Sequence, residues 1–254
     1  MYLKTAKLCF ACYFIELQSI RLPNHSNLAV LYIIATPIGN LSDITHRAVE
    51  TLSKVDTIAC EDTRTSSILL QHYGISKPLF SFHQHNEHHK VEHILNILNG
   101  GQSVAIISDA GMPGISDPGF LAIRAAHQNG HTVTVIPGSD AITTAIVASG
   151  LPSDRFTFEG FLPPKKGRQT RVKAIADSEI TTVVYESPHK LVRFLEMLND
   201  FCDEPRWVCV ARELTKKFEE VNRGLLKDVL ADYKQRPSVK GEIVVVVAGK
   251  NYSE

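Results

Sequence analysis

Two aspartates, three glycines and two prolines lie within twelve residues at 108–119, in the order Ser-Asp-Ala-Gly-Met-Pro-Gly-Ile-Ser-Asp-Pro-Gly. The apolar run 104–107 before this loop predicts a buried parallel strand, and residues 120–126 after it predict a helix. Glycines let a backbone approach a ligand closely, whereas prolines keep a loop rigid. Ligands of parallel α/β sheets bind at the carboxyl ends of strands. The loop is therefore a candidate binding loop, although an ordinary strand-to-helix turn would share its composition.

A second polar cluster, Glu61-Asp62-Thr63-Arg64, follows the apolar run 55–60, which also predicts a strand. Asp62 and Thr63 are typical of the first turn of a helix, where their oxygens accept hydrogen bonds from free N–H groups. Arg64 is less well explained by capping. The cluster is therefore either a helix start or a second part of a site at the same sheet edge.

One concentrated basic run occurs between residues 165 and 173, with no acidic residue inside it. On a helix, Arg168 and Arg171 would share a face, and Lys165 would join them across the preceding turn. Such a face suits either solvent or the phosphate backbone of a nucleic acid, whose binding weakens steeply with salt. The candidate RNA-binding residues are Lys165, Lys166, Arg168, Arg171 and Lys173.

The sequence does not favour a metal site. His89 and His93 are spaced as ligands on one helix face, but a polar, solvated helix explains them as well. Cys9 and Cys12 form a single CxxC with no second pair, and the five cysteines are scattered, as is typical of a reducing cytosol. Phosphate-binding G-x-x-x-x-G-K-[ST], dinucleotide-binding G-x-G-x-x-G and nucleophile-elbow G-x-S-x-G motifs do not occur. We expect no bound metal.

Bulk composition predicts a globular chain without a membrane partner. Its 254 residues carry 27 basic and 27 acidic side chains, so no global charge attracts nucleic acid or lipid. Its hydrophobic content of 44% is ordinary for a globular protein. The sequence contains no apolar stretch near the roughly 20 residues that span a bilayer.

The order of apolar runs predicts an α/β fold with two domains. Strands at 28–35, 55–60, 79–82, 104–107 and 132–136 alternate with helices, which is typical of a doubly wound parallel sheet. After Pro137-Gly138 the pattern becomes less regular, with strands at 181–185, 207–211 and 243–247. We expect an extension at 1–27, an N-terminal α/β domain at 28–138, and a smaller α/β domain with a mixed sheet at 139–254. Residues 151–164 and 215–223 give no clear prediction.

Six motifs in this order resemble the small-subunit ribosomal RNA cytidine 2′-O-methyltransferases of the tetrapyrrole-methylase fold family. They span residues 31–41, 61–64, 108–119, 185–189, 211–216 and 240–243. The resemblance covers about residues 28–249. It implies two α/β domains with S-adenosylmethionine (SAM) in the cleft between them. The cofactor-binding positions that it implies are Pro37, Ala110, Gly111, Met112, Ile115, Pro137, Gly138, Asp140, Ala141, Tyr185, Glu186 and Leu214.

The sequence departs from the family pattern at three places. Met112 and Gly114 stand where the RNA enzymes usually have Thr and Leu, and Ser139-Asp140 replaces a Pro followed by a small residue. An acid at Asp140 would meet either the sulfonium or the amino group of SAM.

The resemblance implies methylation of a cytidine ribose 2′-hydroxyl in 16S ribosomal RNA of the small subunit. A ribose hydroxyl must lose its proton to act as a nucleophile. We expect Glu61, Asp62 and Asp109 to accept or orient that proton, and Arg64 to hold a phosphate or ribose. We also expect a cytoplasmic homodimer. Two alternatives stay open: a methylase of a small tetrapyrrole, and a SAM-binding ribosome-assembly factor without catalytic activity.

Overall fold

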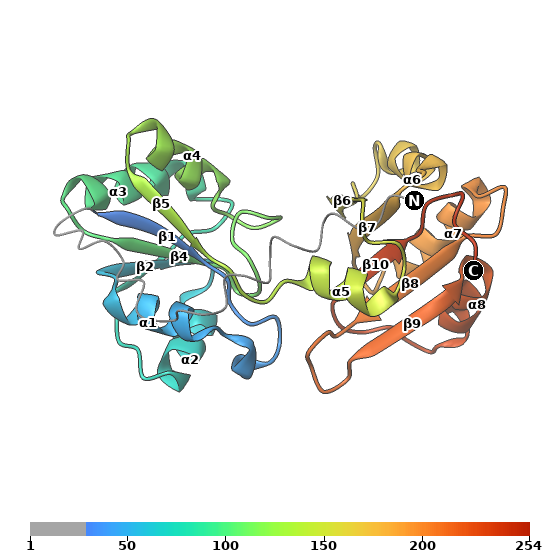
Figure 1. Cartoon of the computed structure of the whole chain (residues 1–254), viewed down its shortest axis with the longest axis horizontal. Helices are drawn as coiled ribbons and strands as arrows, with labels where there is room; N and C mark the ends of the chain where they lie inside the picture. Colours follow the sequence, from blue (N-terminus) through green and yellow to red (C-terminus); the bar gives the residue numbers. More distant parts are fainter. Residues whose placement is uncertain (1–28) are drawn as a thin grey trace, which may run out of the picture.

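The computed structural model describes residues 29–254. The predicted extension at 1–27 lies outside the described residues. Figure 1 shows two α/β units side by side, one built around each of two five-stranded sheets. The strands of the first sheet all end before Pro137, and those of the second all begin after Asp140. The domain boundaries themselves stay a prediction.

The first sheet is parallel throughout, as predicted, with the strand order β3-β2-β4-β1-β5. Its central strands are continuous apolar runs because helices cover both of its faces. The strands are β1 (Val30–Ile34), β2 (Thr57–Cys60), β3 (Leu79–Ser81), β4 (Val104–Ile107) and β5 (Thr132–Ile136).

Two pairs of helices bury the two faces of the first sheet. Leu52 and Leu70 pack with Ile107 on one face, and Ile94 and Ala122 pack on the other. Helices α1 (His46–Lys54) and α2 (Thr63–His72) cover the first of these faces, and α3 (Glu87–Asn99) and α4 (Phe120–Gln128) cover the second. A short 3-10 helix at Leu41–Asp43 follows the loop after β1. The doubly wound architecture is therefore confirmed.

The second sheet is mixed, as predicted, with the strand order β6-β7-β10-β8-β9. The pair β6 and β7 is parallel, and the other three pairs are antiparallel. Both sheets have five strands. The C-terminal domain was expected to be the smaller one, but its sheet has as many strands as the first. The strands are β6 (Phe156–Phe161), β7 (Thr181–Glu186), β8 (Trp207–Arg212), β9 (Glu220–Leu225) and β10 (Ile243–Val247).

Edge strand β6 lies within 151–164 and most of edge strand β9 lies within 215–223, the two segments without a clear prediction. Strands β6 and β9 carry polar residues and glycine, and they are only partly buried. The register of β6 shifts between Phe158 and Phe161, where Gly160 has a φ of 61°. Polar side chains are common in edge strands, so no apolar run marks these two strands in the sequence.

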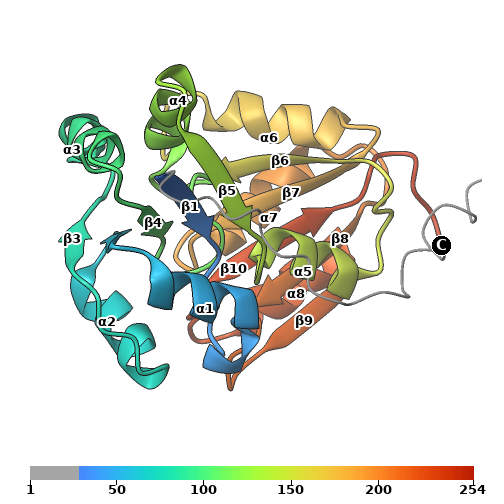
Figure 2. The same cartoon turned by 60° about the vertical axis from the view of Figure 1, so that its left-hand side comes forward.

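Four helices complete the second unit. Helices α6 (Arg168–Asp177), α7 (Leu191–Phe201) and α8 (Leu226–Gln235) cover one face of its sheet. Helix α5 (Ala141–Ser149) covers the opposite face (Figure 2). Ile38, from the loop after β1, joins the apolar cluster under α5. The two units therefore share a small core beside the chain crossover. None of the helices within residues 29–254 is long and apolar enough to cross a membrane.

Candidate active-site cleft

The loops after β1 and β4 are joined by backbone hydrogen bonds at the edge of the first sheet. Thr36 N–H donates to the Gly111 carbonyl at 2.9 Å, and Gly111 N–H donates to the Thr36 carbonyl at 3.1 Å. The Thr36 hydroxyl donates to the carbonyl of Ser108, and the Ser108 hydroxyl donates to that of Gly111. Gly111 has a φ of 83°, a conformation that favours glycine. The start of the glycine-rich loop, residues 108–111, is therefore held against the loop after β1.

A cleft of about 260 Å³ lies between this loop and the second unit. One wall comes from the β4–α4 loop, with Ile38 beside it, and the N-terminus of α5 adds Asp140. The ends of β6 and β7 and the start of β10 form the opposite wall. The lining residues are Ile38, Ala110, Gly111, Met112, Ile115, Ser116, Asp117, Asp140, Ala141, Phe161, Tyr185, Glu186, Ser187, Pro188, Gly241, Glu242, Ile243 and Val244.

Asp117 brings a titratable carboxylate into the cleft. Burial, together with the charges of Glu61 and Asp109, raises the pKa of Asp117 to about 6. The pKa values of Glu61 and Asp109 are also raised, mainly by burial and then by neighbouring carboxylates for Glu61. These three acids therefore share one electrostatic environment at the carboxyl edge of the first sheet, and Asp117 is the one that lines the cleft.

Aromatic side chains form the second-unit wall of the cleft. The Tyr185 ring lies 4.9 Å from the Phe158 ring and 5.3 Å from the Phe161 ring, measured between centroids. Phe161 is nevertheless 65% exposed. Burial raises the pKa of the Tyr185 phenol, and the charges of Asp140, Asp117 and Glu242 raise it further. Tyr185 therefore stays protonated. Its apolar aromatic surface lies near three carboxylates of the cleft, those of Asp117, Asp140 and Glu242.

Eight of the twelve predicted cofactor positions line this cleft. They are Ala110, Gly111, Met112, Ile115, Asp140, Ala141, Tyr185 and Glu186. Asp140 also caps α5, because its carboxylate accepts from the Ile142 and Thr143 N–H groups at 3.3 and 2.8 Å. Capping thus explains why an acid stands at this departure from the family pattern.

The other four predicted cofactor positions lie elsewhere. Leu214 is buried in the apolar cluster under α5. Pro137 and Gly138 are exposed, although Gly138 packs closely on Ala35. Pro37 lines a neighbouring pocket of about 140 Å³. None of these four residues is part of the cleft wall.

The polar cluster at 61–64 does not line the cleft. Asp62 is the N-cap of α2, accepting from the Arg64 N–H at 2.8 Å, and the Arg64 guanidinium binds its other oxygen at 2.6 Å. These contacts lower the pKa of Asp62 to about 2. The Asp109 carboxylate accepts from the Asp62 N–H at 3.2 Å and faces the same small pocket as Pro37. The structure thus brings 61–64 and Asp109 together beside the cleft.

The structure corrects the prediction for Arg168 in the basic run. Its side chain is buried and forms an ion pair with the buried carboxylate of Glu186, so it is not available to a nucleic acid. Arg171 is exposed but pairs with Glu159 at 2.7 Å. Lys165, Lys166 and Lys173 are exposed. The predicted face shared by Arg168 and Arg171 is therefore not a continuous basic surface.

The histidine-rich segment does not assemble a metal site in the described part of the chain. His93 packs edge-on against Phe80, with ring centroids 4.9 Å apart. Within residues 29–254, no three His, Cys, Asp or Glu side chains are grouped to hold a metal ion. Cys9 and Cys12 lie outside the described residues.

Sequence reasoning missed ten of the residues that line the cleft. Asp117 belongs to the loop at 108–119, but of the two aspartates in that loop only Asp109 is predicted as a site residue. Residues 241–243 belonged to the last of the six motifs, yet they were not assigned to the site. The missed residues are Ile38, Ser116, Asp117, Phe161, Ser187, Pro188, Gly241, Glu242, Ile243 and Val244. Motif membership was the signal that would have found most of them.

Similar proteins agree with this architecture. The family model of tetrapyrrole (corrin/porphyrin) methylases matches residues 30–230. Proteins named ribosomal RNA small subunit methyltransferase I are 47% identical in Haemophilus influenzae and 48% identical in Escherichia coli O157:H7. Those alignments cover 89% and 88% of this chain and 80% and 79% of the relatives. The Mycoplasmopsis pulmonis protein of the same name is 46% identical over 86% of this chain and 97% of its own.

Solved structures show the same fold at low identity. The methyltransferase CobJ is 20% identical with a TM-score of 0.65, covering 89% of this chain and 96% of its own. Cobalt precorrin-4 methyltransferase is 16% identical with a TM-score of 0.62, covering 87% and 94%. The family resemblance found in the six motifs is thereby confirmed. This chain belongs to the tetrapyrrole (corrin/porphyrin) methylase family.

Proposed function

We propose that this chain transfers a methyl group from SAM to small-subunit ribosomal RNA, at the 2′-oxygen of a cytidine ribose. The observation that carries the proposal is the identity of 46–48% with proteins named ribosomal RNA small subunit methyltransferase I. The cleft supports it because predicted cofactor positions from two of the six motifs, 108–119 and 185–189, converge there with Asp140 and Ala141.

The cleft residues fit the chemical parts of SAM. The Tyr185 ring and the Ile115 side chain offer a flat and an apolar surface for an adenine ring. Asp117, Asp140 and Glu242 place carboxylates where a sulfonium and an amino group would be stabilised. Gly111 and Gly241 line the wall with φ values of 83° and 94°, which favour glycine.

SAM supplies an electrophilic methyl group when it is bound. The residues of this chain must then align the ribose hydroxyl with that carbon, which accounts for most of the catalysis in such a displacement. Asp117 is our first candidate to accept the hydroxyl proton, because it lines the cleft and its pKa is about 6. Glu61 and Asp109 remain candidates through the same acidic environment.

Asp62 and Arg64 suit a different role. The lowered pKa of Asp62 makes its carboxylate a weak base. We propose that the pair orients the substrate, with the exposed Arg64 guanidinium meeting a phosphate or ribose. This places 61–64 on the substrate side of the first unit.

The RNA is proposed to approach the mouth of the cleft at Phe161. Lys165 and Lys166 follow it closely in the chain and are exposed, and Lys173 lies further along α6. Arg171 would first have to leave Glu159. The proposed partner is the small ribosomal subunit, which places the protein in the cytoplasm. A homodimer stays part of the proposal.

The test uses methyl-labelled SAM, unmethylated small subunits and the purified full chain. Label is expected on one cytidine 2′-oxygen, located by resistance of the adjacent bond to alkaline cleavage. Asp62→Ala and Arg64→Ala should each reduce the rate at least tenfold. Glu196→Gln, which alters an exposed ion pair with Lys234, is the matched control and should change nothing. Label on a porphyrinoid but not on RNA would overturn the proposal. Subunit binding without transfer would indicate an assembly factor.

A further inference from the structure

The turn after β8 contains two non-glycine residues in the left-handed region of the backbone. Glu213 has a φ of 51° and Thr215 has a φ of 66°. Such residues are held in place by their surroundings, because the conformation costs about 1–3 kcal/mol. This turn lies beside the start of β10, since Arg212 pairs with Ile243 in the sheet register. The strain is thus located next to the cleft wall.

Glu213 makes a closed pair of hydrogen bonds with Glu242, which lines the cleft. Glu213 N–H donates to the Glu242 carbonyl at 2.9 Å, and Glu242 N–H donates to Oε1 of Glu213 at 2.9 Å. The second bond is the main reason why the pKa of Glu213 lies below its usual range, and Lys216 lowers it further. The ionised Glu213 side chain therefore accepts a hydrogen bond from a backbone N–H, that of Glu242, which lies just outside the strand pairing of β8 and β10.

The Glu213 side chain also lies directly against Gly241. A Cβ atom on Gly241 would come 2.4 Å from Cγ and 2.6 Å from Oε1 of Glu213. Gly241 has a φ of 94°, so both its conformation and the lack of space require glycine. The position of this cleft residue is therefore set by the side chain behind it.

Lys216 extends this contact to the first unit. Its Nζ lies 3.2 Å from Oε1 of Glu213 and 3.0 Å from Oε2 of Glu242. A Cβ atom on Gly39 would come 2.4 Å from Cγ of Lys216, so the lysine stem packs on the loop after β1. Glu213 and Lys216 together link the second-unit wall of the cleft to the first unit.

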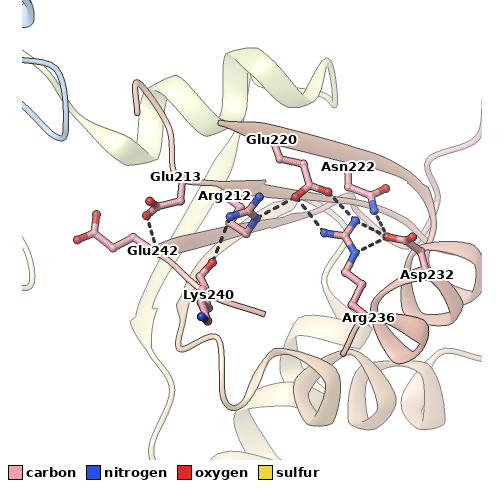
Figure 3. Close-up of polar contacts among 8 residues, drawn as sticks. All are labelled: Arg212, Glu213, Glu220, Asn222, Asp232, Arg236, Lys240 and Glu242. Atoms are coloured by element: carbon pink, nitrogen blue, oxygen red, sulfur yellow. Dashed lines mark hydrogen bonds and ion pairs between the residues drawn. The ribbon is translucent and has the colours of Figure 1, made fainter. Parts of the chain in front are cut away.

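A second set of contacts holds the residue before Gly241. Figure 3 shows Arg212 donating to the Lys240 carbonyl, at 3.3 Å, while its Nε binds Glu220 at 2.8 Å. Glu220 in turn accepts from Arg236, the residue after α8, at 2.5 and 3.0 Å. These contacts anchor the start of β10 to β9 and α8. Shared, half-buried charges of this kind orient one another more firmly than an isolated surface pair.

We infer that Glu213 is a positioning residue for the cofactor cleft, which fixes the Gly241–Glu242 wall from behind and ties it to the first unit. The inference rests on the proposed function, because SAM is the ligand whose affinity it concerns. Glu213 does not line the cleft, so its contribution acts through the wall it holds. The essential property of Glu213 is a side chain long enough to accept the hydrogen bond from Glu242 N–H. The negative charge of this side chain is less important for holding the wall.

Two conservative variants separate reach from charge. Glu213→Gln keeps the length and an oxygen that accepts from Glu242 N–H, whereas Glu213→Asp keeps the charge but is one methylene shorter. We expect Glu213→Asp to raise the Kd for SAM about tenfold, as the loss of one hydrogen bond would. Glu213→Gln should stay within about threefold of the unchanged chain. The rate at saturating SAM should change less than the affinity in both, because neither alters a residue that touches the reacting atoms.

The measurements are calorimetric titration of the full chain with SAM, methyl transfer to small subunits, and thermal unfolding. Glu196→Gln, in an exposed ion pair away from the cleft, is the matched control. An unchanged Kd in Glu213→Asp, or a larger loss in Glu213→Gln than in Glu213→Asp, would overturn the inference. If the unchanged chain does not bind SAM, the proposed function fails and the inference fails with it. If it binds SAM but does not methylate RNA, only the proposed substrate fails.

Discussion

Arg168 and Glu186 form a buried ion pair directly behind the cleft. Their side chains are 5% and 3% exposed, although one stands in the basic run of α6 and the other ends β7. Oε1 of Glu186 also accepts from the Ser187 N–H at 2.7 Å. Glu186 lines the cleft and pairs with Ile243 in β10. The pair therefore connects α6 to the second-unit wall of the cleft.

Removal of one partner of this pair should destabilise the fold. Arg168→Met would leave the Glu186 carboxylate buried without a counter-charge, which costs about 3–5 kcal/mol in comparable cases. We expect the free energy of unfolding in urea to fall by that amount. Lys165→Met, at an exposed position three residues earlier, is the control and should change it by less than about 0.5 kcal/mol. Equal stability of the two variants would show that the pair does not support the fold.

Asp117 should make the protein less stable as the pH rises from about 4 to about 6. Its folded pKa of about 6 lies above the ordinary value, so the folded state binds more protons than the unfolded state in this window. Asp117→Asn removes that cost. The variant should therefore have a higher thermal midpoint than the unchanged chain at pH 7.5 and the same midpoint near pH 4.

The same substitution tests the proton acceptor. If Asp117 takes the hydroxyl proton, Asp117→Asn should reduce kcat about 100-fold or more, the usual contribution of a positioned base. Rate profiles of the unchanged chain should rise with pH through about 6, because the ionised carboxylate is the active form. A more stable variant with an unchanged rate would assign the base to Glu61 or Asp109 instead.

Gly111→Ala should disturb the paired loops at the cleft. The nearest atom to a Cβ would be Cγ2 of Ile38 at 3.5 Å, an ordinary contact, so the cost comes from the φ of 83°. That conformation costs an L-residue about 1–2 kcal/mol. Chemical denaturation should show this loss. Gly224→Ala, where Val229 at 3.5 Å is the nearest neighbour, serves as the comparison and should be nearly neutral. A neutral Gly111→Ala would mean that the loop can change its conformation.

Phe161 should discriminate between the two ligands of the cleft. It is 65% exposed at the cleft mouth and contacts the Tyr185 ring. Stacking of a nucleobase on such a ring contributes about 1–3 kcal/mol. We expect Phe161→Ala to raise KM for small subunits at least fivefold and Phe161→Tyr to restore it, with the Kd for SAM changed less than twofold. A larger effect on SAM than on RNA would instead place the adenine ring on Phe161.

The sequence could predict the first unit almost completely. Its central strands, such as Val104–Ile107, are buried on both faces and therefore appear as continuous apolar runs. The helix start at Asp62 was one of the two interpretations that the sequence allowed, because capping depends on one local side chain. Motif order was enough to indicate the family. These properties are encoded within a few neighbouring residues.

The tertiary structure alone decided which charged residues are buried and which face the cleft. The sequence indicates Arg168 as a surface base, whereas the structure pairs it with the buried Glu186. The edge strands β6 and β9 are recognised as strands only from their pairing with β7 and β8. Burial raises the pKa of Asp117, and the charge of Glu61, which is distant in the chain, raises it further. Glu213 reaches Gly241 only because β8 and β10 are neighbours in the sheet. Periodicity and capping are local, whereas burial, pKa and the shape of a cleft arise from contacts between segments that only folding brings together.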